Sequence, residues 1–323
     1  MKPTSRHWSV LTASIALVIS SAAFGAAHGD PKTLHFLIPG GAGGGWDGTA
    51  RGAGEALTQS GLLQSASYEN MSGGGGGKAI AHLIETADRA KGTLMVNSTP
   101  IILRSLRGRF PQSFRDLTAI AGVIGDYGAF VVPVNSPYQS FADVARDYRA
   151  DPKSVRVAGG SVKGSMDHLV AAMAFQAYGG QPDRVRYISY DAGGKAMAGM
   201  LSGEAQLLST GMGEVLAQAR AGQLRILCVT APTPVAGHPP CGNGITFVNW
   251  RGFFGAPGLD DATADRYAKL LKNVQDTPEW ETVRARNGWV NIYNGRDDFA
   301  AFLESQEVAM KSLLNQLGIQ TVR

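Results

Sequence analysis

Four glycine-rich segments carry the polar residues of this chain that could hold a small solute. They are IPGGAGGGWDGTAR (38–51), NMSGGGGGKAIA (70–81), AGGSVKGSMDHL (158–169) and YDAGGKAMAGML (190–201). Glycine tolerates positive φ and lets a ligand approach the backbone, and a helix that follows offers unpaired N–H groups and the positive end of its dipole. Glycine turns between strands and helices are also common structural features, but four at matching positions predict a site for an anion.

A nucleotide is the alternative anion, and the sequence argues against it. No segment matches GxxxxGK[ST], and the acidic residue expected about 20 positions after a dinucleotide loop is not evident. Asp47 would repel a phosphate beside the first loop. The loops therefore predict a small anion other than a nucleotide, and no cofactor.

The side chains around the loops have competing interpretations. Trp46 either packs on the carbon skeleton of a ligand, donates its N–H, or is a hydrophobic residue at the rim. Asp47 is interpreted as a helix N-cap in preference to a ligand contact. Ser161 and Ser165 are candidate hydroxyl donors to a carboxylate, although Ser165 can equally cap its helix.

The charged residues near the loops are interpreted more cautiously. Asp167 and His168 fall in the first turn of a predicted helix, as supports for the loop. Lys78, Lys163 and Lys195 lie in or just after glycine loops, where a lysine opposes the helix dipole unless an anion is present. A solvated lysine is the alternative at each position, and we expect at most one or two of the three to contact ligand.

A catalytic interpretation, such as a hydrolase that uses His168 with a serine, is not favoured. The sequence has no GxSxG motif, and Ser165 and His168 are too close together for a usual triad. Cys228 and Cys241 form no CxxC pair, and His238 is the only other metal-ligand type between them. We expect neither catalytic residues nor a metal.

The elements that must position these loops alternate between short apolar runs and amphipathic stretches. Strands are predicted over 34–38, 68–70, 93–97, 129–134, 155–158, 187–190, 206–209 and 224–230. Helices are predicted over 47–60, 78–87, 141–150, 165–178 and 195–201, with mostly helix from 261 onward. This order predicts an α/β fold with parallel sheets and helices on both faces. The 323 residues indicate two lobes with one sheet each, and crossings near 130–133 and 230.

The N-terminal segment reads as a signal peptide (1–27), with a basic start, an apolar stretch and small residues before a cleavage point after Gly25 or Ala27. Export makes a disulfide between Cys228 and Cys241 the favoured interpretation, worth about 3 kcal/mol, over two buried thiols. The net charge of +4 is spread along the chain, so no nucleic-acid partner is expected.

The sequence resembles the receptors of tripartite tricarboxylate transporters, the TctC or Bug family. The matching stretches are PGGAGGGWDGTAR, NMSGGGGGKAIA, DPKSVRVAGGSVKGSMDHL, YDAGGKAMAGMLSGEAQLLSTGMGEV, GQLRILCVTAP and WRGFFGAPG, which span nearly the whole mature chain. The resemblance implies a type II periplasmic binding-protein fold with a ligand cleft between lobes. One lobe would comprise 31–131 and 231–323, and the other 132–230.

The resemblance also implies a function and a set of site residues. It implies a monomeric periplasmic receptor that binds a small carboxylate, with citrate as the leading candidate, and delivers it to membrane permease subunits; a sensing receptor is the alternative. The implied ligand-binding residues are Gly43, Gly44, Gly45, Trp46, Asp47, Ser98, Thr99, Ser161, Lys163, Ser165, Asp167, His168, Gly193, Gly194, Thr210 and Glu214. The GGGGGKA form of the second loop and Lys163 depart from the family pattern, which leaves the exact acid open.

Overall fold

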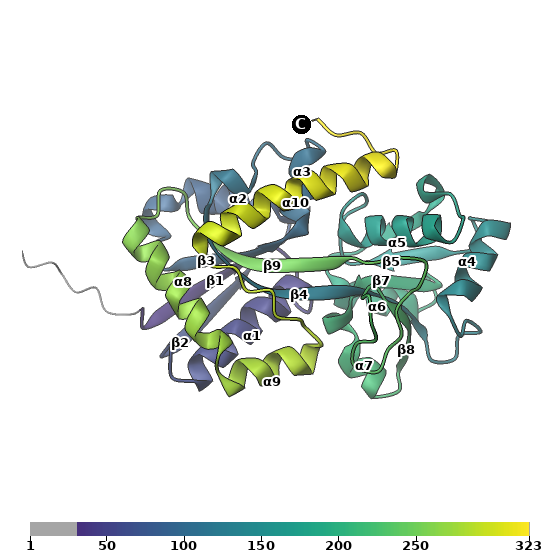
Figure 1. Cartoon of the computed structure of the whole chain (residues 1–323), viewed down its shortest axis with the longest axis horizontal. Coiled ribbons are helices and arrows are strands. Elements are labelled where there is room, and N and C mark those ends of the chain that lie inside the picture. Colours follow the sequence, from purple (N-terminus) through teal and green to yellow (C-terminus); the bar gives the residue numbers. More distant parts are fainter. Residues whose placement is uncertain (1–30, 323) are drawn as a thin grey trace, which may run out of the picture. The chain divides into compact units, whose positions relative to one another are not determined.

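The computed structural model describes residues 31–322, and the predicted signal peptide with its cleavage at Gly25 or Ala27 lies outside them (Figure 1). The strands are β1 (Thr33–Ile38), β2 (Ser65–Asn70), β3 (Thr93–Ser98), β4 (Thr118–Pro133), β5 (Arg156–Gly159), β6 (Arg186–Ser189), β7 (Leu207–Gly211), β8 (Leu224–Val229) and β9 (Val248–Gly255). The helices are α1 (Gly45–Gln59), α2 (Gly77–Glu85), α3 (Thr99–Leu106), α4 (Phe141–Ala150), α5 (Met166–Ala177), α6 (Gly193–Leu201), α7 (Leu216–Arg220), α8 (Asp261–Gln275), α9 (Pro278–Asn287) and α10 (Arg296–Gln316). The predicted α/β alternation is confirmed.

One long strand, β4, joins the two lobes. The strand order is β2-β1-β3-β9-β4-β7-β5-β6, with β8 also paired to β4. Residues 118–127 of β4 pair with β9, and residues 128–131 pair with β7. We call the part built on β1, β2, β3 and β9 the first lobe, and the part built on β5 to β8 the second lobe. The two expected sheets are therefore connected through a shared strand.

The expectation of purely parallel sheets is wrong at the centre of the fold. β1 is parallel to β2 and β3, and β5 is parallel to β6 and β7, as predicted. In contrast, β9 is antiparallel to β3 and β4, and β4 is antiparallel to β7 and β8. β9 and the first eleven residues of β4 were not predicted, because glycines and charged residues interrupt their apolar pattern.

Helices cover both faces of each lobe, as expected (Figure 1). In the first lobe, α1, α8 and α9 bury their apolar residues with Phe36, Ile124 and Phe253 on one face. On the other face, α2, α3 and α10 share a core with α4 and α5 of the second lobe. α6 and α7 cover the remaining face of the second lobe. No helix between residues 31 and 322 has the length and apolar character needed to cross a bilayer.

The predicted disulfide between Cys228 and Cys241 is confirmed, and the alternative of two free thiols is wrong. It closes the loop between β8 and β9. The Tyr178 hydroxyl at the end of α5 donates to the Cys241 carbonyl at 2.7 Å, so this loop packs on the second lobe. The residue limits expected for the lobes, 31–131 with 231–323 and 132–230, stay a prediction.

Candidate functional site

The first glycine loop ends at the N-terminus of α1. Gly44 is the N-cap in extended backbone, and Asp47 is the third residue of the helix, so the interpretation of Asp47 as the N-cap is wrong. Its carboxylate instead accepts the Gly43 N–H at 3.0 Å and pairs with Arg51 at 2.8 Å. Gly43 adopts a φ of 76°, which favours glycine. The Asp47 side chain thus stabilises the conformation of the first glycine loop.

Trp46 forms one wall of the site. Its indole N–H donates to the Ser98 hydroxyl at 2.8 Å, which joins the first loop to the start of α3. Ser98 and the indole ring both line the cavity described below. Because the N–H is already bonded, Trp46 offers a ligand mainly its apolar surface. Thr99, the next residue, is fully buried and lies outside the lining.

The third glycine loop is organised by a reciprocal pair of hydrogen bonds. The Asp167 carboxylate accepts the Ser161 N–H at 2.9 Å, and the Ser161 hydroxyl accepts the Asp167 N–H at 3.0 Å. Tyr187 donates to the Ser161 carbonyl at 2.7 Å. Burial raises the pKa of Asp167 to about 6 against these hydrogen bonds. The prediction that Asp167 supports this loop matches its contacts, and it also reaches the cavity.

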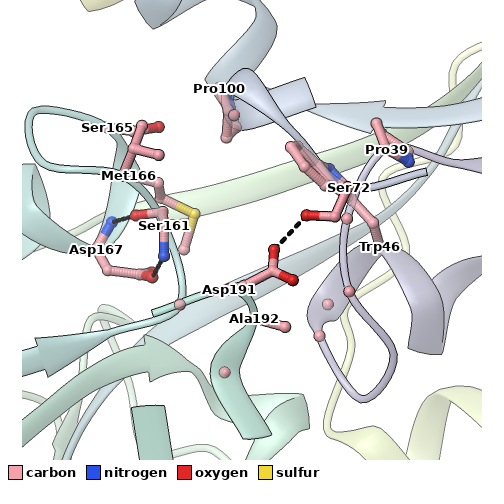
Figure 2. A pocket seen from close by; sticks show the side chains of 18 of the residues that line it. Pro39, Trp46, Ser72, Pro100, Ser161, Ser165, Met166, Asp167, Asp191 and Ala192 are labelled. Carbon is pink, nitrogen blue, oxygen red and sulfur yellow. Dashed lines mark hydrogen bonds between the residues drawn. The ribbon is translucent and has the colours of Figure 1, made fainter. Parts of the chain in front are cut away.

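His168 and Ser165 make different contacts at the start of α5. His168 Nδ1 accepts the Gly164 N–H at 3.2 Å, and burial, with the charges of Lys163 and Arg107, lowers the pKa of His168 to about 4. The imidazole is therefore neutral at physiological pH. Ser165 is the N-cap of α5, but its side chain makes no capping hydrogen bond and its residue is 1% exposed. Its hydroxyl is left facing the cavity, as Figure 2 shows.

The fourth loop meets the second one across the lobes. The Ser72 hydroxyl donates to the Asp191 carboxylate, drawn as a dashed line in Figure 2. Ala192 adopts a φ of 92°, a strained value for alanine, immediately before α6. This turn brings Ala192 against Gly44, where a Cβ on Gly44 would lie 3.0 Å from the Ala192 Cβ. The two lobes are thus in contact at the edge of the site.

The floor of the site holds a buried charge cluster of Arg251, Asp126 and Glu214. The Arg251 guanidinium pairs with Asp126 at 2.7 Å, lies 3.7 Å from Glu214, and donates to the Thr49 hydroxyl at 3.2 Å. Arg251 is 2% exposed and Asp126 is fully buried. Burial, opposed by Arg251 and reinforced by Asp167 and Asp126, raises the pKa of Glu214 to about 8. Glu214 is therefore largely protonated at neutral pH and can donate a hydrogen bond.

These elements surround one cavity of about 310 Å³ between the lobes. Its lining includes Gly40, Gly41, Ser72, Gly73, Gly75, Pro100, Gly160, Tyr190, Asp191, Asn249 and Arg251, besides predicted residues. Of the predicted residues, Gly44, Gly45, Trp46, Ser98, Ser161, Ser165, Asp167, Gly193 and Glu214 line it. The others, Gly43, Asp47, Thr99, Lys163, His168, Gly194 and Thr210, lie outside the lining. The predicted loops therefore meet at a single place.

Sequence reasoning missed Arg251, Asp126 and Asn249. Arg251 had a usable signal, because a charged residue inside the apolar run VNWRGFFG must be paired if that run is a buried strand. Asn249 also lies on β9; it is 3% exposed and its Oδ1 has no hydrogen-bond partner in residues 31–322. The Asn249 Oδ1 is thus an unused hydrogen-bond acceptor, which suits a hydroxyl group and not a carboxylate oxygen of a ligand.

Glu214→Gln will reduce the loss of stability at alkaline pH. Because the pKa of Glu214 rises from 4.5 in the unfolded chain to about 8 when folded, the folded state binds the extra proton between these values. The contribution of this proton to the free energy of unfolding is fully present below pH 4.5 and is lost as the pH rises through 8. Between pH 6 and pH 9 the melting temperature of Glu214→Gln should fall by about 3 °C less than that of the wild type. Glu85→Gln, at an exposed position, is the control; parallel curves for all three proteins would contradict the assignment.

A family model described as the tripartite tricarboxylate transporter family receptor matches residues 49–319. A UPF0065 protein of Bordetella bronchiseptica is 22% identical over 320 residues, which cover 96% of this chain and 93% of that protein. The periplasmic binding protein BugD is 18% identical with a TM-score of 0.78, covering 89% of this chain and 98% of that one.

Two similar solved structures contain dicarboxylates. MatC of Rhodopseudomonas palustris, solved with malate, is 15% identical with a TM-score of 0.76 over 87% of this chain and 98% of that one. Rpa4515 of R. palustris, solved with adipate, is 17% identical with a TM-score of 0.78 over 89% and 98%. At these identities the likeness shows the fold, which is that of the two-lobed periplasmic binding proteins.

Proposed function

Because this chain belongs to the tripartite tricarboxylate transporter receptor family, we propose that it binds a small organic carboxylate outside the cytoplasm and delivers it to a membrane permease. Citrate or a related di- or tricarboxylate is the proposed ligand. The protein performs no chemistry on it and acts as a monomer. The malate and adipate in the structures of two similar proteins support the carboxylate class.

The observation that carries this proposal is the meeting of three helix N-termini at one cavity. Gly45 begins α1 in the first lobe, while Ser165 caps α5 and Gly193 begins α6 in the second lobe; all three line the cavity. Each N-terminus presents unpaired N–H groups and a partial positive charge to an anion. A carboxylate held by both lobes would favour the contact between them.

The acidic residues in the lining are compatible with an anionic ligand. Glu214 is uncharged at neutral pH and can donate to a carboxylate oxygen. Asp167 is already bonded by Ser161, and Asp191 by Ser72. The ligand oxygens are thus left to the free N–H groups and the Ser165 hydroxyl.

An extracytoplasmic location is part of the same proposal. The basic and apolar N-terminal segment supports export, and the Cys228–Cys241 disulfide suits an oxidising compartment. BugD, which shares the fold, is described as a periplasmic binding protein.

Thermal unfolding of the purified mature chain with a panel of acids tests the proposal. A ligand at a hundredfold excess over its dissociation constant stabilises the folded state by about 2.7 kcal/mol. We expect a clear increase in melting temperature with citrate or another di- or tricarboxylate, and none with nucleotides at equal ionic strength. Unchanged melting with every carboxylate would refute the proposal.

A further inference from the structure

A group of four cationic side chains lies at the edge of the cavity where α3 meets the third glycine loop. It comprises Arg104, Arg107 and Arg109 at the end of α3, and Lys163 in the loop; we call it the basic cluster. The two segments come from different lobes, and α3 and α5 are in contact. In Figure 2, Pro100 in the first turn of α3 and Ser165, the N-cap of α5, lie on the same side of the cavity. The cluster is thus assembled only when the lobes are together.

Contacts fix Arg104 and Arg107 at this edge. Arg107 donates to the Gly164 carbonyl at 2.7 Å, across the lobes. The Arg104 guanidinium lies against Gly75 of the second glycine loop, where a Cβ would be 2.8 Å from its Nε. Gly75 lines the cavity, and so do Val162 and Ser165 on either side of the Lys163–Gly164 pair. None of the four cations lines the cavity itself, so the cluster lies next to these lining residues at the edge of the cavity.

The positive charges in the cluster act on one another. Burial lowers the pKa of Arg104, and the charges of Arg109 and Arg107 lower it further; Arg107 is affected in the same way by burial and Arg109. Lys163 precedes Gly164, whose carbonyl accepts from Arg107, so the loop lysine lies near the α3 arginines. Like charges gathered in this way destabilise the closed arrangement of the lobes.

No carboxylate compensates these charges within residues 31–322. None of the four forms an ion pair there, whereas Arg115, Arg286 and Arg296 each pair with Asp or Glu. The Arg104 Nε is buried and has no hydrogen-bond partner. A cluster that is repulsive by itself, at the edge of an anion-binding cavity, is suited to a negative group brought by the ligand.

We propose that the basic cluster is a second anion subsite, which binds the far carboxylate of a ligand whose first carboxylate lies at the helix N-termini. The receptor then selects acids with at least two carboxylates over monocarboxylates of the same length. Binding of the second carboxylate also relieves the repulsion between α3 and the third loop. This inference rests on the proposed function and specifies its substrate class.

Calorimetric titration with acids matched in chain length tests the subsite. The pairs are succinate with butanoate, glutarate with pentanoate, and adipate with hexanoate, at low ionic strength and neutral pH. In the best pair we expect the diacid to bind at least about tenfold more tightly, since hydrogen bonds to charged groups are the strong ones. Equal affinities within every pair would overturn the subsite.

Three variants identify the residues responsible. In Arg104→Gln, Arg107→Gln and Lys163→Gln, the ratio of monoacid to diacid dissociation constants should fall toward one while monoacid affinity changes by less than about twofold. Lys269→Gln, an equal loss of charge at an exposed position on α8, should keep the wild-type ratio. Melting curves without ligand check that each variant folds.

The outcomes separate the subsite from the proposed function. If Arg107 only holds the lobes together through Gly164, Arg107→Gln will weaken both acids equally and the ratio will survive; that result counts against the subsite. Ratios that survive in all three variants overturn it. Binding of monoacids and diacids alike would leave the proposed function standing, whereas absence of binding for every acid would remove the proposed function and the subsite with it.

Discussion

Gly160→Ala should weaken carboxylate binding by at least about tenfold while most of the fold persists. Gly160 directly follows β5 in the third glycine loop and lines the cavity. An alanine Cβ there would lie 2.3 Å from the Gly193 nitrogen and 2.5 Å from the Ala192 carbonyl carbon. Both are backbone atoms, so the N-terminus of α6 must move. Overpacking of this kind lowers the free energy of unfolding by about 1–3 kcal/mol. The displaced turn is the one that presents its N–H groups to the ligand.

Gly48→Ala is the matched control for this prediction. Gly48 lies in α1 three residues after Gly45, and its Cβ would approach only Trp289, at 4.0 Å. Alanine is the better helix former, so this variant should bind as the wild type does and gain up to about 1 kcal/mol in stability. Titration with the acid that gives the largest thermal shift measures both variants. Wild-type affinity in Gly160→Ala would show that the α6 N-terminus does not contact ligand.

The four glycine loops show how much of the site could be predicted from sequence. A strand, a glycine run and a helix start are local patterns, and β1–α1, β5–α5 and β6–α6 have the expected limits within about two residues. That parallel strands place such turns at one edge of a sheet is a general property of α/β folds. Local pattern and general topology thus predicted the loops, and the resemblance to the receptor family supplied the expectation that Gly45, Ser161 and Gly193 face one cleft.

Side-chain roles were less predictable, because they depend on which of two nearby groups a residue contacts. The position of Asp47 beside the glycine run is compatible with a helix N-cap and with a side chain that accepts a hydrogen bond from the loop backbone. The hydrogen bond from the Gly43 N–H shows that the second role is the one adopted. Thr99 and Ser98 are neighbours, yet only Ser98 points to the cavity. A helix start rotates successive side chains by about 100°, so a shift of one residue changes the outcome.

The floor of the site could not be assembled from local patterns. Asp126 and Arg251 are 125 positions apart, and their pairing depends on the antiparallel register of β4 and β9, which the sequence did not predict. An isolated Asp in GVIGDYG resembles a turn residue as much as a buried strand residue. Register between distant strands is set by tertiary packing, which no window along the chain contains.

Arg251→Met is expected to have the largest effect on stability, a loss of about 3–5 kcal/mol, because it leaves the fully buried Asp126 carboxylate without its counter-charge. Burial already raises the pKa of Asp126 against the attraction of Arg251. Without the arginine, Asp126 must take up a proton to stay buried, and Glu214 must keep its proton to a higher pH. The loss should therefore be greatest at alkaline pH and should shrink as the pH falls.

A double-mutant cycle separates this charge effect from lost packing. Asp126→Asn keeps an oxygen that can accept the Gly213 N–H, now accepted by Asp126 Oδ1 at 3.1 Å, and removes the buried negative charge. Adding it to Arg251→Met should recover more than half of the lost unfolding free energy, measured by urea denaturation at neutral pH. If the two losses of unfolding free energy simply add, Arg251 acts through packing against Gly45. The packing there is close, since a Cβ added to Gly45 would lie 2.1 Å from the Arg251 Nη2. Recovery of stability without recovery of binding would place the arginine's charge in contact with ligand as well.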